Sequence, residues 1–240
     1  MTRADGQLAG SDERGWRTNE HGQPVGVPMP EWAGALAPTG ATLTGRLVTL
    51  RPLGVGDGAD LAAAYERQSD AHWTYLPVDR PVGERATRAV LESALAGPNV
   101  PYAVLLDEVA AGMLSLMRID ERNGVIEIGW VAFGPALQRT AASTEAQRLL
   151  MGHVFDDLGH RRLEWKCDAL NEPSMRAAER LGYTFEGVFR QHVVVKGRSR
   201  DTAWWAMTDG EWPAVRARLD AWLDPSNFDE AGRQRTALGT

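Results

Sequence analysis

The segment Gln138–Ala146 has the position and the residue types of a phosphate-binding loop. It joins the end of an apolar, strand-like run to the start of an amphipathic helix, where free backbone N–H groups and the positive end of the helix dipole attract an anion. Arg139 adds a positive side chain. The segment lacks the glycines that such loops usually carry. The sequence therefore predicts that N–H groups and a hydroxyl hold a nucleotide-derived ligand there without a glycine-dependent turn.

The overall composition argues against several classes of protein. The chain has 240 residues, of which 43% are apolar and 24% charged, as in an ordinary globular protein. Its net charge of −6 provides no basic field for nucleic acid, and the short basic run 196–200 is typical of a solvated turn. The single cysteine, Cys167, excludes a disulfide framework and a structural zinc site, so we expect no metal.

The division of the chain follows from its turn-forming and apolar residues. Residues 1–42 are rich in Pro and Gly and form an N-terminal extension, residues 43–224 form one domain, and residues 225–240 form a polar tail. The extension either covers an acceptor slot or mediates a homodimer. No window reaches the roughly 18 apolar residues of a membrane span, and the polar N-terminus has no signal-peptide core. We therefore expect a cytoplasmic protein with no membrane partner.

The apolar periodicity predicts an order of helices and strands within the domain. A strand over 46–50 precedes a helix that Asp57 can cap and a helix over 83–96. The remaining elements are strands over 102–106, 111–119 and 125–133, a helix over 144–158, a strand over 163–169, a helix over 171–181, and a hairpin of 187–195 with 202–207. The central strand–helix–strand step favours one parallel pair within a mixed sheet, which makes the fold α+β.

A second group of polar residues opens the helix at 171–181. Asn171 can cap this helix and Pro173 is tolerated in its first turn, but capping does not explain the spacing to Leu181-Gly182-Tyr183. With that spacing the chain resembles the GNAT superfamily of acyl-CoA-dependent N-acyltransferases, and within it the RimJ/RimL-like branch. The resemblance covers about residues 43–212 and also rests on Glu127-Ile128-Gly129-Trp130, Gln138-Arg139-Thr140, Thr144-Glu145-Ala146, Ser174, Glu186-Gly187, Arg190, Gly197, Arg200-Asp201 and Glu211-Trp212-Pro213.

The resemblance implies a fold and a binding slot. The fold is a GNAT-like, mostly antiparallel sheet of about seven strands, flanked by helices, with a central β-α-β crossover. Its fourth strand, here Val125–Phe133, carries a bulge and splays from the fifth, here Leu163–Ala169, which opens a slot for the pantetheine arm of acetyl-CoA or a close acyl-CoA. The implied acyl-CoA-binding residues are Val131, Ala132, Phe133, Gln138, Arg139, Thr140, Ala141, Ala142, Ser143, Thr144, Asn171 and Ser174.

The pyrophosphate loop departs from the superfamily pattern Q/R-x-x-G-x-G/A. Its two small positions are occupied by Ala141 and Ser143. Because alanine disfavours a positive φ, we expect a negative φ at Ala141. We expect Ser143 to serve as the N-cap of the helix and to offer its hydroxyl to phosphate.

The reaction implied by the resemblance needs a base and, less strictly, an acid. Glu127 is the candidate base: it precedes Gln138 by eleven positions, as the catalytic glutamate does in some related acetyltransferases, and it would act through a water. The alternative for Glu127 is a salt-bridged strand residue without chemistry. Many relatives carry an acidic tyrosine seven residues after the Asn, but Ala178 stands there. Ser174 is the candidate substitute, and its alternative is a hydroxyl at the helix start that only caps.

The acceptor in such a reaction is an amine. Candidate acceptor-slot residues are Trp73, Tyr75, Tyr102, Trp130 and His192, although clustered tryptophans and a lone strand histidine are often structural. The acidic balance of the chain favours a cationic amine, either a protein N-terminus or a small molecule. The alternative to an enzyme is a non-catalytic acyl-CoA-binding or interaction protein, which the missing tyrosine and glycines motivate.

Overall fold

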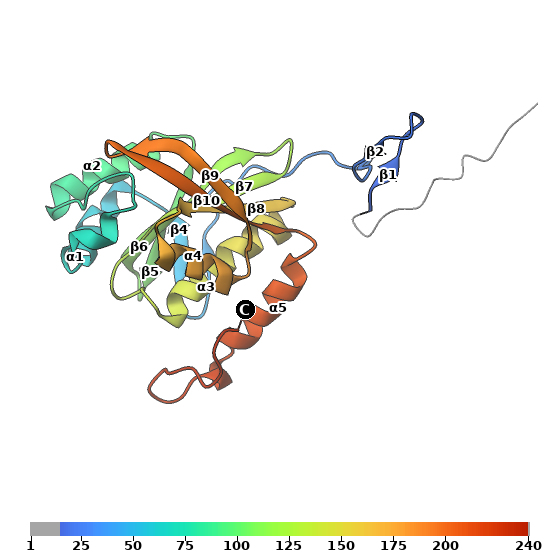
Figure 1. Cartoon of the computed structure of the whole chain (residues 1–240). Helices are drawn as coiled ribbons and strands as arrows, with labels where there is room; N and C mark the ends of the chain where they lie inside the picture. Colours follow the sequence, from blue (N-terminus) through green and yellow to red (C-terminus); the bar gives the residue numbers. More distant parts are fainter. Residues whose placement is uncertain (1–14, 240) are drawn as a thin grey trace, which may run out of the picture. The chain divides into compact units, whose positions relative to one another are not determined.

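The computed structural model describes residues 15–239 (Figure 1). The chain divides into two compact units after Ala33. The described part of the first unit holds a short antiparallel hairpin of β1 (Arg17–Thr18) and β2 (Pro24–Val25). Residues 34–42 belong with the second unit, because the N–H groups of Ala35 and Leu36 donate to the carbonyls of Glu121 and Leu158. The sequence placed the division at residue 42, and the first 14 residues lie outside the described part.

The second unit is built on an eight-stranded sheet whose order is β3-β4-β5-β6-β7-β8-β10-β9. The strands are β3 (Leu43–Thr44), β4 (Thr49–Pro52), β5 (Val100–Leu106), β6 (Val109–Asp120), β7 (Val125–Phe133), β8 (Arg162–Asp168), β9 (Thr184–Val195) and β10 (Arg198–Thr208). Every neighbouring pair is antiparallel except β7 and β8. The predicted α+β class with one central parallel pair is therefore confirmed.

Five α-helices flank this sheet: α1 (Gly58–Glu66), α2 (Gly83–Leu95), α3 (Ala141–Gly152), α4 (Glu172–Leu181) and α5 (Trp212–Leu223). The predicted start of α3 at residue 144 is wrong by one turn, and the helix continues into a π-helical turn over His153–Asp157. Helix α5 was not predicted, although its buried Leu219, Trp222 and Leu223 follow helical spacing. Within residues 15–239, no helix combines the length and the apolar composition needed to cross a membrane.

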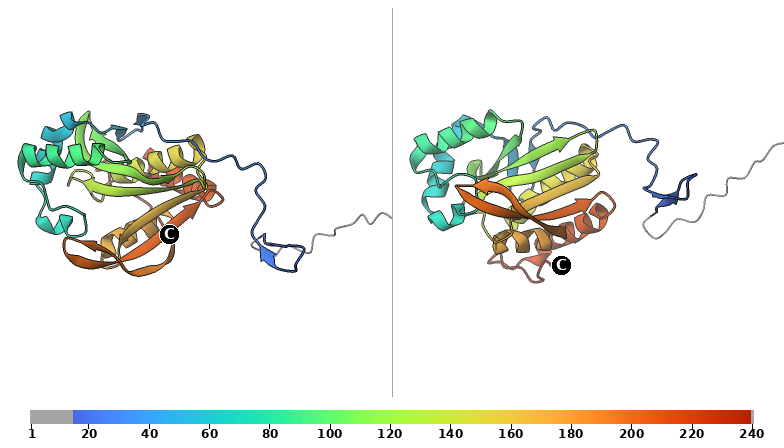
Figure 2. Two further views of the ribbon diagram at one scale, coloured as in Figure 1. Left: turned by 90° about the horizontal axis from the view of Figure 1, so that it is seen from above. Right: turned by 45° about the horizontal axis from the view of Figure 1, so that its top comes forward.

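The two faces of the sheet carry separate hydrophobic cores, as the alternation of buried residues along β5 shows. Tyr102 and Val104 pack with α3, α4 and α5, whereas Ala103 and Leu105 pack with α1 and α2. The two groups of helices therefore lie on opposite faces (Figure 2). Residues after α5 pack against the body as well, since Leu238 is buried in the first core and Trp222 Nε1 donates to Gln234.

Candidate active site

Strands β7 and β8 separate in the middle of the sheet. They pair only where Val125–Glu127 meets Arg162–Glu164, although β7 continues to Phe133 and β8 to Asp168. Past this vertex the register of β7 against β6 shifts, and Trp130 takes a φ of 54°. A left-handed conformation at a non-glycine residue costs about 1–3 kcal/mol, so the surrounding structure must impose it. The predicted bulge and the splayed pair are confirmed.

Side chains from α1 and from the following loop fix the end of β7. The carbonyl of Ala132 accepts a hydrogen bond from Tyr65 Oη at 3.1 Å, and burial raises the pKa of this phenol, which keeps it protonated. The carbonyl of Phe133 accepts from Gln68 Nε2 and Gln138 Nε2, both at 2.7 Å. Of the residues Val131–Phe133, expected to bind the acyl-CoA, Ala132 and Phe133 therefore have partners within the protein at their carbonyls, and Gln138 shapes the strand end.

The loop after β7 leads into α3 without a glycine turn. Ala141 is the first helical residue and has no positive φ, as expected, and the left-handed residue is Arg139, with a φ of 60°. The N-cap is Thr140, whose Oγ1 accepts from the N–H of Ser143 at 3.2 Å, so the prediction that Ser143 caps the helix is wrong. The Ser143 hydroxyl instead donates to the Thr140 carbonyl at 2.8 Å. The first-turn N–H groups of Ala141 and Ala142 and the exposed Arg139 remain as the anion seat.

Replacing the cap should lower stability measurably. Thr140→Val removes the bond from the Ser143 N–H and the bond that Thr140 Oγ1 donates to the Leu137 carbonyl. We expect the free energy of unfolding to fall by about 1–2 kcal/mol, measured by denaturant titration. Ser143→Ala is the matched control, because it keeps both of those bonds and should cost less. An equal loss in the two variants would contradict the assignment of Thr140 as the cap.

The start of α4 lies beside the slot, next to β8. Asn171 is its N-cap, and its side chain accepts from the N–H of Ser174 at 3.3 Å. The Ser174 hydroxyl accepts from Trp165 Nε1 at 3.0 Å, so it does not act as the cap. Burial raises the pKa of the neighbouring Cys167 thiol, and a hydrogen bond with Ser174 opposes that rise. Ala178 is completely buried in the core, which leaves no hydroxyl at the position of the usual acid.

Glu127 occupies the vertex at which β7 and β8 separate. Its side chain is 5% exposed, and its Oε2 lies 2.7 Å from Arg118 Nη1 and 2.9 Å from Lys166 Nζ. Its other oxygen, Oε1, extends over Gly129, where an added Cβ would lie 3.0 Å from it. Two cations therefore contact one oxygen of this buried carboxylate.

The contacts of Glu127 belong to a row of alternating charges across four strands. Lys166 Nζ lies 2.6 Å from Glu164 Oε2, and Glu164 Oε1 lies 2.9 Å from Arg162 Nε. Arg162 then pairs with Glu186 on β9 at 2.5 Å. The sequence reasoning missed Arg118, Glu164 and Lys166. The available signal was the charged residue at every second position of a central strand, which places these side chains on one face.

Aromatic side chains continue this face toward β9. The Trp204 ring centroid lies 4.0 Å from Lys166 Nζ and 4.6 Å from the Phe189 ring. His192 packs on both rings, and its Nδ1 lies 3.0 Å from Thr202 Oγ1. The structure therefore brings His192 to the same face as Glu127, as expected for an acceptor-slot residue.

The other candidate acceptor residues lie in different environments. Trp130 and Tyr75 are half-buried, with Trp130 packed against the core beneath α1 and α2. Trp73 is buried in that core and donates to Gln68 Oε1, and Tyr102 is completely buried in the opposite core. The prediction that the Trp73 and Tyr102 side chains line an open slot is wrong, because apolar packing takes both rings out of solvent. Thr144 is also buried, and its hydroxyl accepts from Arg180.

The tip of the β9–β10 hairpin reaches the segment between α1 and α2. Lys196 Nζ donates to the Trp73 carbonyl at 2.8 Å and lies 3.0 Å from Asp79 Oδ1. These contacts join parts of the chain 123 residues apart. Trp73 therefore contacts the hairpin through its backbone carbonyl. The same hairpin carries the rings of Phe189, His192 and Trp204.

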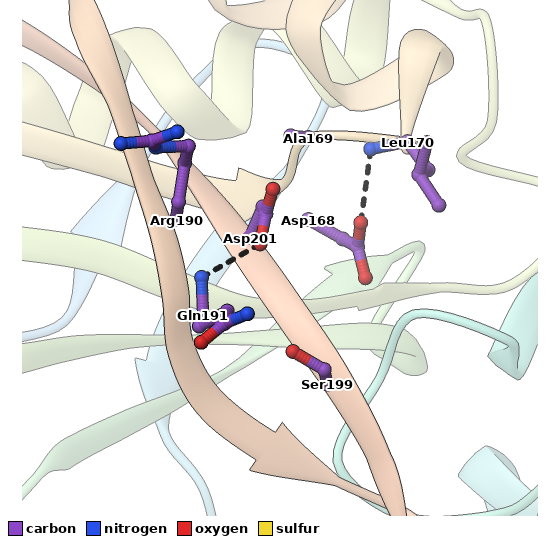
Figure 3. A pocket seen from close by; sticks show the side chains of 7 residues that line it. All are labelled: Asp168, Ala169, Leu170, Arg190, Gln191, Ser199 and Asp201. Carbon is purple, nitrogen blue, oxygen red and sulfur yellow. Dashed lines mark hydrogen bonds between the residues drawn. The ribbon is translucent and has the colours of Figure 1, made fainter.

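A polar cavity of about 860 Å³ lies beyond the end of β8 (Figure 3). Its lining residues are Asp168, Ala169, Leu170, Arg190, Gln191, Ser199 and Asp201. Asp201 accepts from the N–H of Gln191, which holds an irregular turn in β9, and Asp168 accepts from the N–H of Leu170. Both carboxylates are therefore used to shape the backbone at this end of the sheet.

Comparisons with known proteins identify the fold and the family. The family model described as the Acetyltransferase (GNAT) domain matches residues 47–184. A solved GCN5-related N-acetyltransferase from Brucella melitensis is 44% identical, with a TM-score of 0.85 over 88% of this chain and 97% of its own. RimJ from Mycobacterium smegmatis, solved in complex with CoA-disulfide, is 23% identical, and its TM-score of 0.63 over 76% of this chain and 95% of its own shows a shared fold.

A curated relative, YdaF from Bacillus subtilis, is 31% identical over 115 residues, which span 48% of this chain and 62% of YdaF. The chain thus covers less than two thirds of this relative. The family match itself includes β7, the loop after it and α3, and it ends just after α4. The matched residues therefore include both splayed strands, β7 and β8, and the loop and helix start proposed to hold an anion. The chain therefore belongs to the GNAT acetyltransferase family and is related to its RimJ/RimL-like members.

Proposed function

We propose that the protein transfers an acetyl group from acetyl-CoA to a primary amine. The observation that carries this proposal is the position of Glu127. It is a buried carboxylate at the point where β7 and β8 separate, it contacts two cations, and it is the last residue of β7 that pairs with β8. Beyond it the two strands are no longer paired with each other.

The residues around the slot fit acetyl-CoA. The N–H groups at the start of α3 and the Arg139 side chain suit a pyrophosphate. The separated strands leave unpaired backbone that suits the amides of a pantetheine arm. When bound, acetyl-CoA supplies an acyl group on a thioester, which an amine can attack. Because Ala132 pairs with Met113 of β6 and the Phe133 carbonyl has intramolecular partners, we assign the N–H group of Phe133 and the backbone of Val131 to the ligand.

The protein's own task is to move protons. As the new C–N bond forms and the C–S bond breaks, the amine loses a proton and the departing sulfur gains one. Glu127 Oε1 takes the amine proton, directly or through a water. We assign Ser174 as the donor toward the departing sulfur: its oxygen accepts from Trp165 Nε1, and its hydroxyl proton would turn from the neighbouring Cys167 to that sulfur.

The acceptor approaches over the face that carries Glu127, Trp204 and His192. Carboxylates and aromatic rings together suit a cationic amine before it loses its proton. YdaF carries a provisional designation as a ribosomal N-acetyltransferase, which favours a protein N-terminus. A small amine fits the same chemistry, and the test below includes both.

The experiment measures free CoA thiol released from acetyl-CoA. The amine panel pairs a peptide with a free N-terminus against the same peptide with a blocked N-terminus and one lysine, and adds several small amines. We expect thiol release with at least one amine and a matching acetylated product by mass spectrometry. If CoA binds but no amine releases thiol, the protein is a non-catalytic acyl-CoA-binding protein, and the proposal fails. The missing hydroxyl at Ala178 makes this alternative worth testing.

A further inference from the structure

The chain contains only two lysines among its 26 basic residues, and one of them lies against the proposed base. The Lys166 side chain is 5% exposed. Its Nζ contacts Glu127 on β7, Glu164 on its own strand and the Trp204 ring on β10. A buried ammonium with two carboxylates and an aromatic ring has its charge compensated on three sides. Lys166 is therefore held in one place.

The contacts of Glu127 are asymmetric. Arg118 and Lys166 both approach Oε2 most closely, and among residues 15–239 no hydrogen bond to Oε1 is seen. Oε1 extends over Gly129, the residue before the bulge. A Cβ at position 129 would lie 3.0 Å from Oε1, so the glycine keeps the space around this oxygen open. One oxygen of the carboxylate is thus held by cations, and the other faces the splayed part of β7.

We propose that Lys166 is a positioning residue for Glu127: it holds Oε2 and leaves Oε1 as the oxygen that receives the proton of the acceptor. The inference rests on the proposed function, in which Glu127 is the base. Arg118 alone does not fix the carboxylate, because its side chain is 55% exposed and approaches from the solvent side. Lys166 supplies the buried contact from the opposite strand. Glu164 and Trp204 in turn hold Lys166.

Lys166 is also a primary amine in the site of an enzyme that modifies amines, so its own acetylation is the competing role. Its Nζ already contacts two carboxylates and the Trp204 ring, and these contacts turn it away from attack on a thioester. We therefore expect Lys166 to remain unmodified during turnover. With only two lysines in the chain, peptide mass spectrometry can check this directly.

The charged and titratable groups that face Glu127 come from several elements. They are Arg118 from β6, Lys166 and Glu164 from β8, and Tyr183, which lies between α4 and β9. The Tyr183 phenol has a raised pKa, first because it is buried and second because of the Glu127 charge, so it stays neutral. Removing Lys166 therefore removes one of the two cations that contact Glu127 and leaves Arg118 alone.

The kinetic test compares Lys166→Met with two other variants. We expect Lys166→Met to lower kcat by about 10²-fold, since a small displacement of a catalytic group has effects of this order. KM for acetyl-CoA should change little, because the loop at Arg139–Ala142 lies on another element. Lys166→Arg should regain only part of kcat, because a planar guanidinium cannot occupy the same point.

Arg162→Met is the matched control. Arg162 is two residues away on the same strand and bonds to Glu164 and Glu186, but it does not contact Glu127. If the row of alternating charges has only a structural role, Arg162→Met and Lys166→Met should lose similar amounts of kcat. That result, or acetylated Lys166 in the wild type, would overturn the proposal.

A crystal structure of Lys166→Met tests the positioning without any turnover. We expect the Glu127 carboxylate to rotate so that both oxygens share the single remaining cation, Arg118. A carboxylate that keeps Oε2 on Arg118 and Oε1 over Gly129 would refute the positioning role. If the wild type releases no CoA thiol with any amine, the proposed function fails, and this structure still decides whether Lys166 positions Glu127.

Discussion

Glu127→Gln is expected to lower kcat/KM by about 10²–10⁴-fold, the range for loss of a general base. The amide has nearly the same shape as the carboxylate but cannot accept a proton. Its oxygen can still face Arg118 and Lys166, so the fold around the vertex should persist. The CoA thiol assay gives the rate, and calorimetry gives the affinity for CoA. That affinity should change little, because the anion seat at Thr140–Ala142 lies on another element.

Glu127→Asp changes the position of the carboxylate and keeps its charge. The shorter side chain keeps the carboxylate but withdraws it from Lys166 and from the bulge at Trp130, so we expect an intermediate rate. Glu179→Gln on the exposed face of α4 serves as the control for a charge change elsewhere. If Glu127→Gln kept the wild-type rate, Glu127 would have no part in the reaction. Its role would then be confined to the row of alternating charges.

Glu145→Ala is expected to produce the largest loss of stability. This carboxylate on α3 is buried and accepts the backbone N–H groups of Arg46, Leu47 and Val48 at 3.1, 2.6 and 3.0 Å. It therefore ties the turn between β3 and β4 to the helix. Removing it leaves three donors without an acceptor, for which we expect a cost of about 3–5 kcal/mol. In a chain of this size such a cost lowers Tm by about 6–15 °C.

Differential scanning calorimetry and denaturant titration measure this loss. Glu145→Gln is the matched variant: it retains one oxygen acceptor and should lose roughly half as much, because its NH₂ group faces donors. Glu179→Ala, an exposed glutamate on α4, should change the free energy of unfolding little. A Glu145→Ala protein as stable as Glu179→Ala would show that the turn does not depend on the carboxylate.

The sequence predicted helices and strands well where their formation depends on residues close together in the chain. The strand over 125–133 and the helix over 83–95 were expected almost to the residue, since alternation and helical spacing depend on nearby side chains. The start of α3 was misjudged because Thr140 and Ser143 can both cap a helix. The choice of Thr140 depends on the turn at Gln138–Arg139, which the end of β7 holds in place. Helix α5 was not predicted, although Pro213 in its first turn and the spacing of Leu219, Trp222 and Leu223 are local helix signals.

The candidate site was predictable in part. The spacing from Glu127 to the loop and on to Asn171 indicated a family, and a family implies where its ligands lie. The burial of Trp73 and Tyr102 was not predictable, because an aromatic residue on a strand or in a loop faces whichever layer the sheet twist and the helices assign. Ser174 was expected at the slot, but its bond from Trp165 arises only when β8 and α4 pack together.

The sequence by itself determined the class of protein and the central β-α-β step, and it indicated the loop proposed to bind acyl-CoA, because these depend on the order and spacing of residues along the chain. Only the tertiary structure decided which charges meet. Lys166 and Arg118 reach Glu127 across two different neighbouring strands, and the end of the β7–β8 pairing decides which residues face the slot. Contacts between strands depend on register, and register depends on the packing of both faces of the sheet at once. The sequence indicated the loop proposed to hold an anion. It did not indicate that Oε1 of Glu127 extends over Gly129 and is left open.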